Sequence, residues 1–397
     1  MIYLDAAATT PVKQQILELV WPLMARDFGN PSSTHGIGET AARALDYART
    51  TAAGTLGVRT GDIVFTSGGT EANNLAIIGL ALANPRGRHV IRSGIEHSSV
   101  REACDYLQRH HGFTIDIVPV GPGGLVDPAE LTALLREDTT LVTVMAVNNE
   151  IGTIQPLPEI SAATHAVGAL MHADVVQAAG WLPIAELARD LDALSLSGHK
   201  LGGMKGAGLA MIRGKLALEP GIHGGGQERG RRSGTENIAG AVSTATALRL
   251  ASSQVEAFET TRDRTEQLID TVLDGLNHGR APGQEAALLT GDRGRRVPGI
   301  VSFVFPGANG ETILLELERR GVICSSGSAC AAGSTDPSPV LLGLGLDPDV
   351  ARTAVRLSFT AETTEVQLST AARAVVAAVQ AVTDTAPARV VARPEEA

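Results

Sequence analysis

The sequence predicts an α/β fold in two parts, a large domain with a mostly parallel sheet flanked by helices and a smaller α+β C-terminal domain. Three observations support this prediction. Short apolar runs alternate with helical stretches over residues 60–212, a Gly- and Arg-rich loop follows over 224–240, and a second, shorter set of strands and helices follows residue 299. The length of 397 residues also favours two domains over one.

Seven apolar runs in the first part have the length and composition of strands. They resemble strands that are buried on both faces, as in a mostly parallel sheet covered by helices. The stretches between them, such as 71–83, show helical spacing. The candidate strands are residues 63–66, 89–93, 115–120, 141–147, 170–174, 192–197 and 208–212.

The second part begins after a long helical stretch that runs to about residue 277. The Gly-, Pro- and Arg-rich segment 278–299 is expected to be a loop or hairpin. Candidate strands then lie at 301–305, 322–324 and 355–359, with helices near 310–320 and 364–382. We assign residues 11–257 to the large domain, residues 1–10 with 258–385 to the small domain, and residues 386–397 to a disordered tail.

Composition argues against two broad classes of protein. The formal net charge is −10, whereas general nucleic-acid binding requires clustered Lys and Arg. No apolar run approaches the ~20 residues of a membrane span, and the first residues, MIYLDAAATTPV, lack signal-peptide features. The three cysteines, Cys104, Cys324 and Cys330, do not make a disulfide framework. We therefore expect a cytoplasmic protein with free thiols and no direct nucleic-acid or membrane partner.

Polar residues follow several candidate strands, where ligands bind in open parallel sheets. The turn 67–70, Ser-Gly-Gly-Thr, opens a helix after the first strand. Its small residues and free N–H groups at a positive helix end predict a phosphate cradle. The alternative is a simple helix cap by Ser67 or Thr70.

Asp174 ends another strand, and Gln177 follows three residues later. A carboxylate in this place could hold a protonated heterocyclic nitrogen, or it could cap a helix. His97 also follows a strand, where a neutral imidazole could stack on a planar ring or be a simple polar strand end. Asn148 and Asn149 end a strand as well, and a buried Asn is unfavourable unless it is hydrogen-bonded.

The stretch SLSGHKLGGMKGAG, residues 195–208, is the most informative. Lys200 follows a strand, with Ser197 and His199 beside it and glycines behind it. A lysine that is packed among small residues and partly desolvated can lose its proton and form a Schiff base. An ordinary surface lysine is the alternative, and the Ser-Gly-His-Lys order makes it less attractive.

Cys324 and Cys330 enclose the small residues of CSSGSAC. The spacing alone is compatible with a metal site, a disulfide, a buried thiol or a nucleophile on a mobile loop. Zinc is disfavoured because no CxxC or paired HxxxH is present, so we expect no metal site. The chain also lacks a GxxxxGK[ST] P-loop, and HGGG at 223–226 has no GxSxG partner motif.

Four motifs together make the chain resemble a cysteine desulfurase: Ser-Gly-His-Lys, His-Ala-Asp-x-x-Gln, Thr-Ser-Gly-Gly-Thr-Glu and Ser-Ser-Gly-Ser-Ala-Cys. More narrowly, the chain resembles the NifS/IscS-like branch with a long catalytic loop. The resemblance runs from YLDAAATTP (3–11) to VRLSF (355–359). It implies fold type I of the enzymes that use pyridoxal 5'-phosphate (PLP), the class V aminotransferase family, and a homodimer.

The resemblance assigns cofactor contacts. Lys200 would carry PLP, and Asp174 would keep the pyridine nitrogen protonated so that the ring accepts electrons. His97 would stack on the ring, and Gln177 would bond the phenolic oxygen with Asn149 close to it. The phosphate contacts would be Gly69, Thr70, Ser197, His199 and, reaching the phosphate of the neighbouring subunit, Thr235.

The resemblance also assigns the chemistry. Arg356 would bind the carboxylate of L-cysteine bidentately, helped by Asn30. Lys200 would remove the Cα proton, and the Cys330 thiolate would attack the substrate sulfur. L-Alanine would leave, and the persulfide on Cys330 would pass sulfur to an acceptor protein, such as an iron–sulfur scaffold or a tRNA-thiolation enzyme. The small residues around Cys330 suit a loop that must swing, and a free thiol pKa of ~8.5 leaves some thiolate near neutrality.

The other cysteines receive structural interpretations. We interpret Cys324 as a packing residue, with a resolving role as the alternative, and Cys104 as a core thiol. The chain departs from the family at Val175-Val176, at GGMKG and at Pro339, none of them a catalytic position. Its short C-terminal tail is unlike that of relatives that dock an iron–sulfur scaffold, so the acceptor is less well indicated than desulfuration.

Three alternatives stay open. Selenocysteine lyase activity needs no new residue. Another PLP-dependent reaction, such as transamination, would leave Cys330 unexplained. A non-enzymatic sulfur carrier or regulatory subunit would keep the fold without turnover, and the joint presence of Lys200, Asp174, His97 and Cys330 argues against it.

Overall fold

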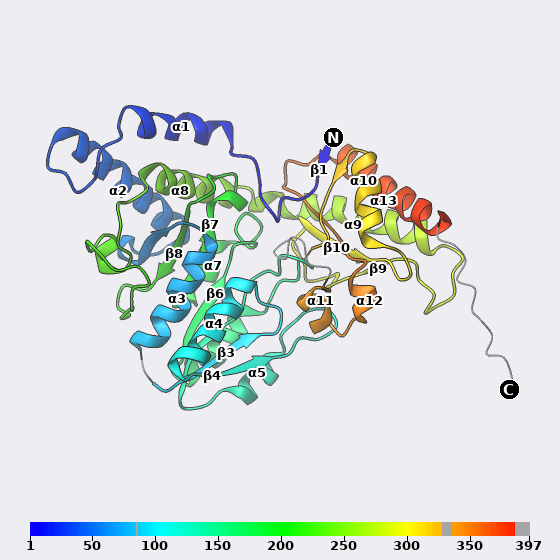
Figure 1. Cartoon of the computed structure of the whole chain (residues 1–397), viewed down its shortest axis with the longest axis horizontal. Coiled ribbons are helices and arrows are strands. Elements are labelled where there is room, and N and C mark those ends of the chain that lie inside the picture. Colours follow the sequence, from blue (N-terminus) through cyan, green and yellow to red (C-terminus); the bar gives the residue numbers. More distant parts are fainter. Residues whose placement is uncertain (85, 328–335, 386–397) are drawn as a thin grey trace.

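The structure is a computed structural model that describes residues 1–84, 86–327 and 336–385. Cys330, the expected nucleophile, lies outside the described residues. The tail 386–397, for which we expect disorder, lies outside them as well. Two bodies lie side by side, and the chain's first residues cross from the smaller body to the larger one (Figure 1).

The larger body contains the seven-stranded, mostly parallel sheet that the sequence predicts. Its order is β2-β8-β7-β6-β5-β3-β4. Only β8 runs antiparallel to its neighbours, β2 and β7. The strands are β2 (Ile63–Thr66), β3 (His89–Ser93), β4 (Thr114–Val118), β5 (Thr139–Thr143), β6 (Leu170–Asp174), β7 (Ala193–Ser197) and β8 (Gly208–Ile212).

Two strands, β4 and β5, differ from the predicted ranges by more than one residue. β4 ends two residues earlier than expected, and β5 begins two residues earlier and ends at Thr143. Residues 144–147 remain buried beyond the end of β5. There the backbone N–H groups of Val144 and Ala146 still donate to β6, to the carbonyls of His172 and Asp174. The apolar run therefore marks burial, which continues past the regular strand.

Helices cover both faces of this sheet, as predicted. α3 (Gly69–Ala83) and α4 (Ser98–His111) lie on one face. The other carries α2 (Gly36–Leu56), α6 (Leu157–Ala166), α7 (Ile184–Arg189) and α8 (Ile238–Ser252). The pleat explains the uniform burial of the strands: Ile63 and Phe65 join the core beneath α2, while Val64 joins the core beneath α3. The remaining helices of this body are α1 (Gln14–Ala25) and α5 (Pro128–Leu134).

The smaller body has its own hydrophobic core, to which Leu4 and residues between 268 and 382 contribute. β10 (Ile300–Val304) pairs antiparallel with β9 (Leu288–Leu289) and β12 (Val355–Ser358). β1 (Ile2–Tyr3) pairs parallel with β11 (Val322–Ile323). The helices are α9 (Phe258–Asn277), α10 (Gly310–Arg319), α11 (Pro339–Gly343), α12 (Pro348–Ala351) and α13 (Glu365–Thr385).

The long helical stretch before residue 277 is two helices. α8 ends at Ser252, a 3-10 turn follows at Val255–Ala257, and α9 begins at Phe258. The division that we place between residues 257 and 258 coincides with this junction and stays a prediction.

α13 is the one helix in the described part of the chain that is long and apolar enough to cross a membrane. Its residues Leu368, Ala371, Ala372, Val375 and Val379 are buried in the core of the smaller body. Packing against that core accounts for its apolar composition.

We predict that this core stabilises the smaller body through residues such as Leu317, which is fully buried on α10. Leu317→Ala should lower the free energy of unfolding by about 2–5 kcal/mol, because it removes apolar contacts and leaves a cavity. Leu315 on the same helix is 59% exposed, so Leu315→Ala should change it by less than about 0.5 kcal/mol. Urea denaturation measures both variants, and equal losses would contradict this packing.

Candidate active site

A cavity of about 460 Å³ lies at the carboxyl ends of β6 and β7, where it also meets Arg356 of the smaller body. It brings together residues that are widely separated in the sequence. Ten of the predicted site residues line it: Gly69, Thr70, His97, Asn149, Asp174, Gln177, Ser197, His199, Lys200 and Arg356.

The N-terminus of α3 forms one end of this cavity. Gly68 is the N-cap residue and supplies no side chain, so the expected cap by Ser67 or Thr70 is wrong. Ser67 instead donates its backbone N–H to Glu71 Oε2 at 2.8 Å. A Cβ atom on Gly69 would lie only 3.1 Å from Val176 Cγ2, so a larger residue would crowd this turn. The helix end and its close-packed glycine suit an anion such as a phosphate.

Asp174 lies at the opposite, buried side of the cavity, at the end of β6. Its Oδ1 accepts the backbone N–H of Val176 at 3.0 Å, and its Oδ2 accepts Asn73 Nδ2 at 2.8 Å. The carboxylate therefore closes a turn, and the interpretation as a helix cap is wrong because the next helix begins only at Ile184. It also lines the cavity, while its role toward a ring nitrogen stays a prediction.

Lys200 ends the 3-10 turn Gly198–Lys200 that directly follows β7. Its Nζ donates to the carbonyls of Ala7 at 2.5 Å and Ala8 at 2.6 Å. Gln177 Nε2 also donates to the Ala7 carbonyl, at 3.1 Å. We call residues 5–10 the N-terminal strap, because this segment crosses the cavity between the two bodies.

His199 is attached to the same strap. Its Nδ1 lies 3.0 Å from Thr9 Oγ1. Burial, reinforced by the nearby Lys200 and Lys205, lowers the pKa of His199 to about 4. The imidazole is therefore neutral near pH 7 and adds no positive charge beside Lys200.

Arg356 on β12 is buried and contacts three other segments. Nη2 pairs with Asp5 Oδ1 of the strap at 2.8 Å. Nη1 donates to the carbonyls of Asn149 and Gly327, both at 3.1 Å. Nε has no hydrogen-bond partner within the described residues. These contacts leave Nε–H and one Nη2–H, two donors on one edge of the guanidinium, for a carboxylate.

The described residues on both sides of segment 328–335 are held close to Arg356. On one side, the Gly327 carbonyl accepts its bond from Arg356. On the other, Ser338 Oγ donates to Glu150 Oε2 at 2.5 Å. Glu150 is buried, burial raises its pKa, and Arg356 opposes that rise.

Asn148 and Asn149 have different roles, one in a buried turn and one in the wall of the cavity. Asn148 is fully buried, and its side chain bonds the Ile95 carbonyl and the backbone N–H groups of Glu150 and Ile151. It therefore builds the turn that follows β5. Asn149 lines the cavity.

Asn30 and Thr235 are exposed and do not line the cavity within one subunit. For Thr235 this agrees with an expected role toward a neighbouring subunit. Asn30 lies in the loop between α1 and α2, where its Oδ1 accepts the backbone N–H of Ser32 at 2.9 Å. Within one subunit this loop lies at the end of the larger body away from β10, the strand that pairs with β12 (Figure 1). The expected assistance of Asn30 to Arg356 stays a prediction.

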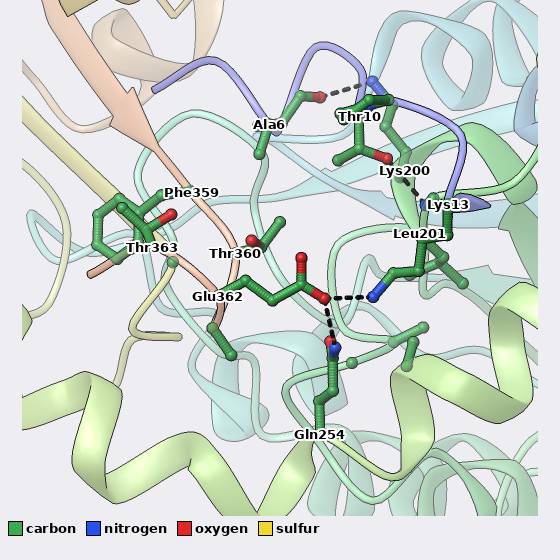
Figure 2. Close-up of a pocket in the computed structure, with 18 of the residues that line it drawn as sticks. Ala6, Thr10, Lys13, Lys200, Leu201, Gln254, Phe359, Thr360, Glu362 and Thr363 are labelled. Carbon is green, nitrogen blue, oxygen red and sulfur yellow. Dashed lines mark hydrogen bonds and ion pairs between the residues drawn. The ribbon is translucent and has the colours of Figure 1, made fainter. Parts of the chain in front are cut away.

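A second cavity, of about 680 Å³, lies on the other side of Lys200, between the strap and the end of α8. Lys13 Nζ pairs with Glu362 Oε1 at 2.6 Å, and Gln254 Nε2 donates to the same oxygen at 3.2 Å (Figure 2). The pair joins the residue before α1 to the turn after β12. Lys200 and Gln177 line both cavities, so they form part of the wall between them.

Sequence analysis missed four groups at this site: Asp5, Asn73, Ser99 and Glu150. Asn73 lies one helical turn after Thr70, so its place on the same face of α3 was a usable signal. The pairing of Asp5 with Arg356 joins residues 351 positions apart, and no local pattern could have indicated it.

The chain belongs to the aminotransferase class-V family, whose model matches residues 2–370. It is 41% identical over 358 residues to the cysteine desulfurase IscS of Methanosarcina thermophila, over 90% of this chain and 86% of that one. It is also 41% identical over 384 residues to the putative cysteine desulfurase IscS 1 of Bacillus subtilis (strain 168), over 96% and 99%. A solved NifS-like protein has a TM-score of 0.86 at 33% identity, over 96% of this chain and 99% of that one.

These relationships make the protein PLP-dependent, as the sequence resemblance implies, with the fold type I architecture. The cavity fits that cofactor on its own geometry. It offers an anion cradle at α3, a buried carboxylate at Asp174 and the amine of Lys200. A phosphate, a protonated ring nitrogen and an aldehyde require these three groups.

We predict that Cys104 and Cys324 are unreactive in the folded protein. Burial raises the pKa of each thiol to about 12, and Asp5 adds to the effect on Cys324. Because only the thiolate is nucleophilic, iodoacetamide at about pH 8 should leave both unmodified. Peptide mass spectrometry measures this, with the urea-unfolded protein as the control in which both react. Equal rates for native and unfolded Cys324 would revive its resolving role.

Proposed function

We propose that the protein is a cysteine desulfurase that converts L-cysteine to L-alanine and transfers the sulfur as a persulfide on Cys330. The observation that carries the proposal is the arrangement around one cavity of Lys200, Asp174 and Arg356, whose Nε–H has no hydrogen-bond partner within the described residues. The relatives named cysteine desulfurase support the same activity.

In this proposal each residue has a defined task. The α3 N-terminus, Ser197 and His199 hold the PLP phosphate, with Thr235 reaching from the neighbouring subunit. Asp174 pairs with the ring nitrogen, and His97 stacks on the ring. When bound, PLP supplies an electron sink for the negative charge that develops at the substrate Cα.

The remaining steps belong to the chain's own side chains. Arg356 binds the substrate carboxylate through Nε–H and Nη2–H. Lys200 takes the proton from Cα. Cys330 Sγ then forms a bond to the substrate sulfur as the substrate Cβ–Sγ bond breaks. The electron pair left at Cβ takes up a proton to give a methyl group, and Lys200 returns its proton to Cα, which completes alanine.

The proposal includes the class of protein that accepts the sulfur. A protein that assembles iron–sulfur clusters or thiolates tRNA would accept the persulfide sulfur. A reducing cytoplasm would keep Cys330 free between turnovers.

The first test measures alanine from L-cysteine in the presence of a reductant, with L-selenocysteine as a second substrate. Cys330→Ala should lower alanine formation from L-cysteine at least about a hundredfold, since only binding and positioning would remain. Cys324→Ala is the matched control and should retain activity. A native protein that binds PLP but forms no alanine would refute the proposal. Activity confined to L-selenocysteine would make it a selenocysteine lyase.

We also propose a homodimer, supported by an exposed apolar face on α1. Leu17, Trp21 and Met24 are 45%, 68% and 53% exposed, and with Val20 and Met204 they line a shallow depression. An apolar patch of this kind on a soluble protein marks an interaction surface. A second copy is the occupant that would also bring Thr235 to a neighbouring cofactor site.

Trp21→Glu should therefore shift the protein from dimer to monomer in sedimentation velocity, because it places a charge in an apolar contact. Val366 on α13 is 73% exposed and outside this face, so Val366→Glu should leave the dimer intact. A monomeric native protein, or a dimeric Trp21→Glu variant, would contradict the proposed interface.

A further inference from the structure

A continuous line of buried hydrogen bonds connects Asp174 with His97. Asn73 Nδ2 donates to Asp174 Oδ2 at 2.8 Å and to Ser99 Oγ at 2.9 Å. Ser99 Oγ lies 2.8 Å from His97 Nδ1. Asn73 is 1% exposed and Ser99 is 7% exposed. Asp174 ends β6, Asn73 lies on α3, and Ser99 lies on the first turn of α4, so the line joins three elements.

The protons in this line have one consistent placement. The Asn73 amide has two N–H donors, and both are used. Ser99 Oγ accepts one of them, so its own proton is available for His97 Nδ1. The backbone N–H of Ser99 also donates to Nδ1, at 3.1 Å. Nδ1 is therefore an acceptor, which places the ring proton of a neutral His97 on Nε2.

The charge on Asp174 selects the orientation of the Asn73 amide. In the opposite orientation, Asn73 Oδ1 would face the carboxylate, and two acceptors would repel each other. In the observed orientation, Oδ1 is buried without a hydrogen-bond partner in the described part of the chain. The cost of burying Oδ1 without a partner is offset by the two hydrogen bonds that the amide donates to Asp174 and Ser99.

We infer that Asn73 is a positioning residue that transmits the ionised state of Asp174, through Ser99, to the tautomer and ring orientation of His97. The inference rests on the proposed function, in which Asp174 and His97 both contact the cofactor ring. The consequence is specific: a neutral His97 ring can stack on a positively charged pyridine ring without charge repulsion.

The test uses the holoenzyme with ¹⁵N-labelled histidine. The ring nitrogen shifts of His97, assigned by the signals that vanish in His97→Gln, report its tautomer. We expect the native protein to carry the proton on Nε2. In Asn73→Asp, which replaces the donor amide by a carboxylate, the shifts should move toward a tautomer mixture or the protonated ring. Ser99→Ala, which removes the hydroxyl link, should move them in the same direction.

Asn74 supplies the matched control, because the one bond of its side chain within the described residues is to the Thr70 carbonyl of its own helix. Asn74→Asp should leave the His97 shifts unchanged. Asn73→Asp should also weaken PLP binding about tenfold, as expected when a hydrogen bond to a charged group is lost. Titration of the apoprotein with PLP, followed by the visible absorbance of the bound cofactor, measures this.

A native His97 that is protonated on Nδ1 would overturn the inference, even if Asn73→Asp fails to fold. Unchanged His97 shifts in both Ser99→Ala and a folded Asn73→Asp would overturn it as well. Neither readout depends on turnover. A protein with the expected tautomer but no alanine formation would refute the proposed desulfurase activity alone.

Discussion

The buried guanidinium of Arg356 is the interaction on which the arrangement of the two bodies depends. It lies on β12 and contacts the strap through Asp5 and the larger body through the Asn149 carbonyl. It also contacts the loop after β11 through the Gly327 carbonyl. A buried charge that loses its partners is strongly unfavourable. The positions of three segments are therefore set by one cation. The same cation retains two donors on one edge, so the group that holds the domains together can also bind a substrate carboxylate.

The N-terminal strap extends this constraint to Lys200. Asp5 fixes the start of the strap at Arg356, and the Ser358 carbonyl accepts the backbone N–H of Ala6. The following carbonyls, of Ala7 and Ala8, are then in place to accept from Lys200. These contacts use backbone atoms, which requires close approach of the chain and explains the small residues of DAAATT. Lys200 of the larger body and Arg356 of the smaller body are thus connected through the four strap residues from Asp5 to Ala8.

Much of this site could be predicted from the sequence because its residues follow strands. Asp174, Ser197 and Lys200 occur at or just beyond the ends of β6 and β7, and parallel strands bring such ends to one edge. Side-chain partners between distant segments could not be predicted in this way. Asn73 could be placed one helical turn after Thr70 on α3, but its bonds to Asp174 and Ser99 depend on how α3 and α4 pack on the sheet. Likewise, the end of β5 depends on pairing with β6, which the apolar run 141–147 does not encode.

Burial also determines which groups near the cavity carry charge. It lowers the pKa of His199 to about 4 and that of His172 to about 3, so both rings are neutral near pH 7. It raises the pKa of Glu96 to about 8, and the nearby Asp174 adds to that rise. Glu96 therefore retains its proton near pH 7, and Oε1 still accepts the Met145 N–H at 2.8 Å. With Glu96 neutral, a ring nitrogen at this end of the cavity meets a single carboxylate, Asp174, whose two oxygen atoms already accept from Val176 and Asn73. These two hydrogen bonds fix the orientation of the Asp174 carboxylate, which lines the cavity where a ring nitrogen would bind.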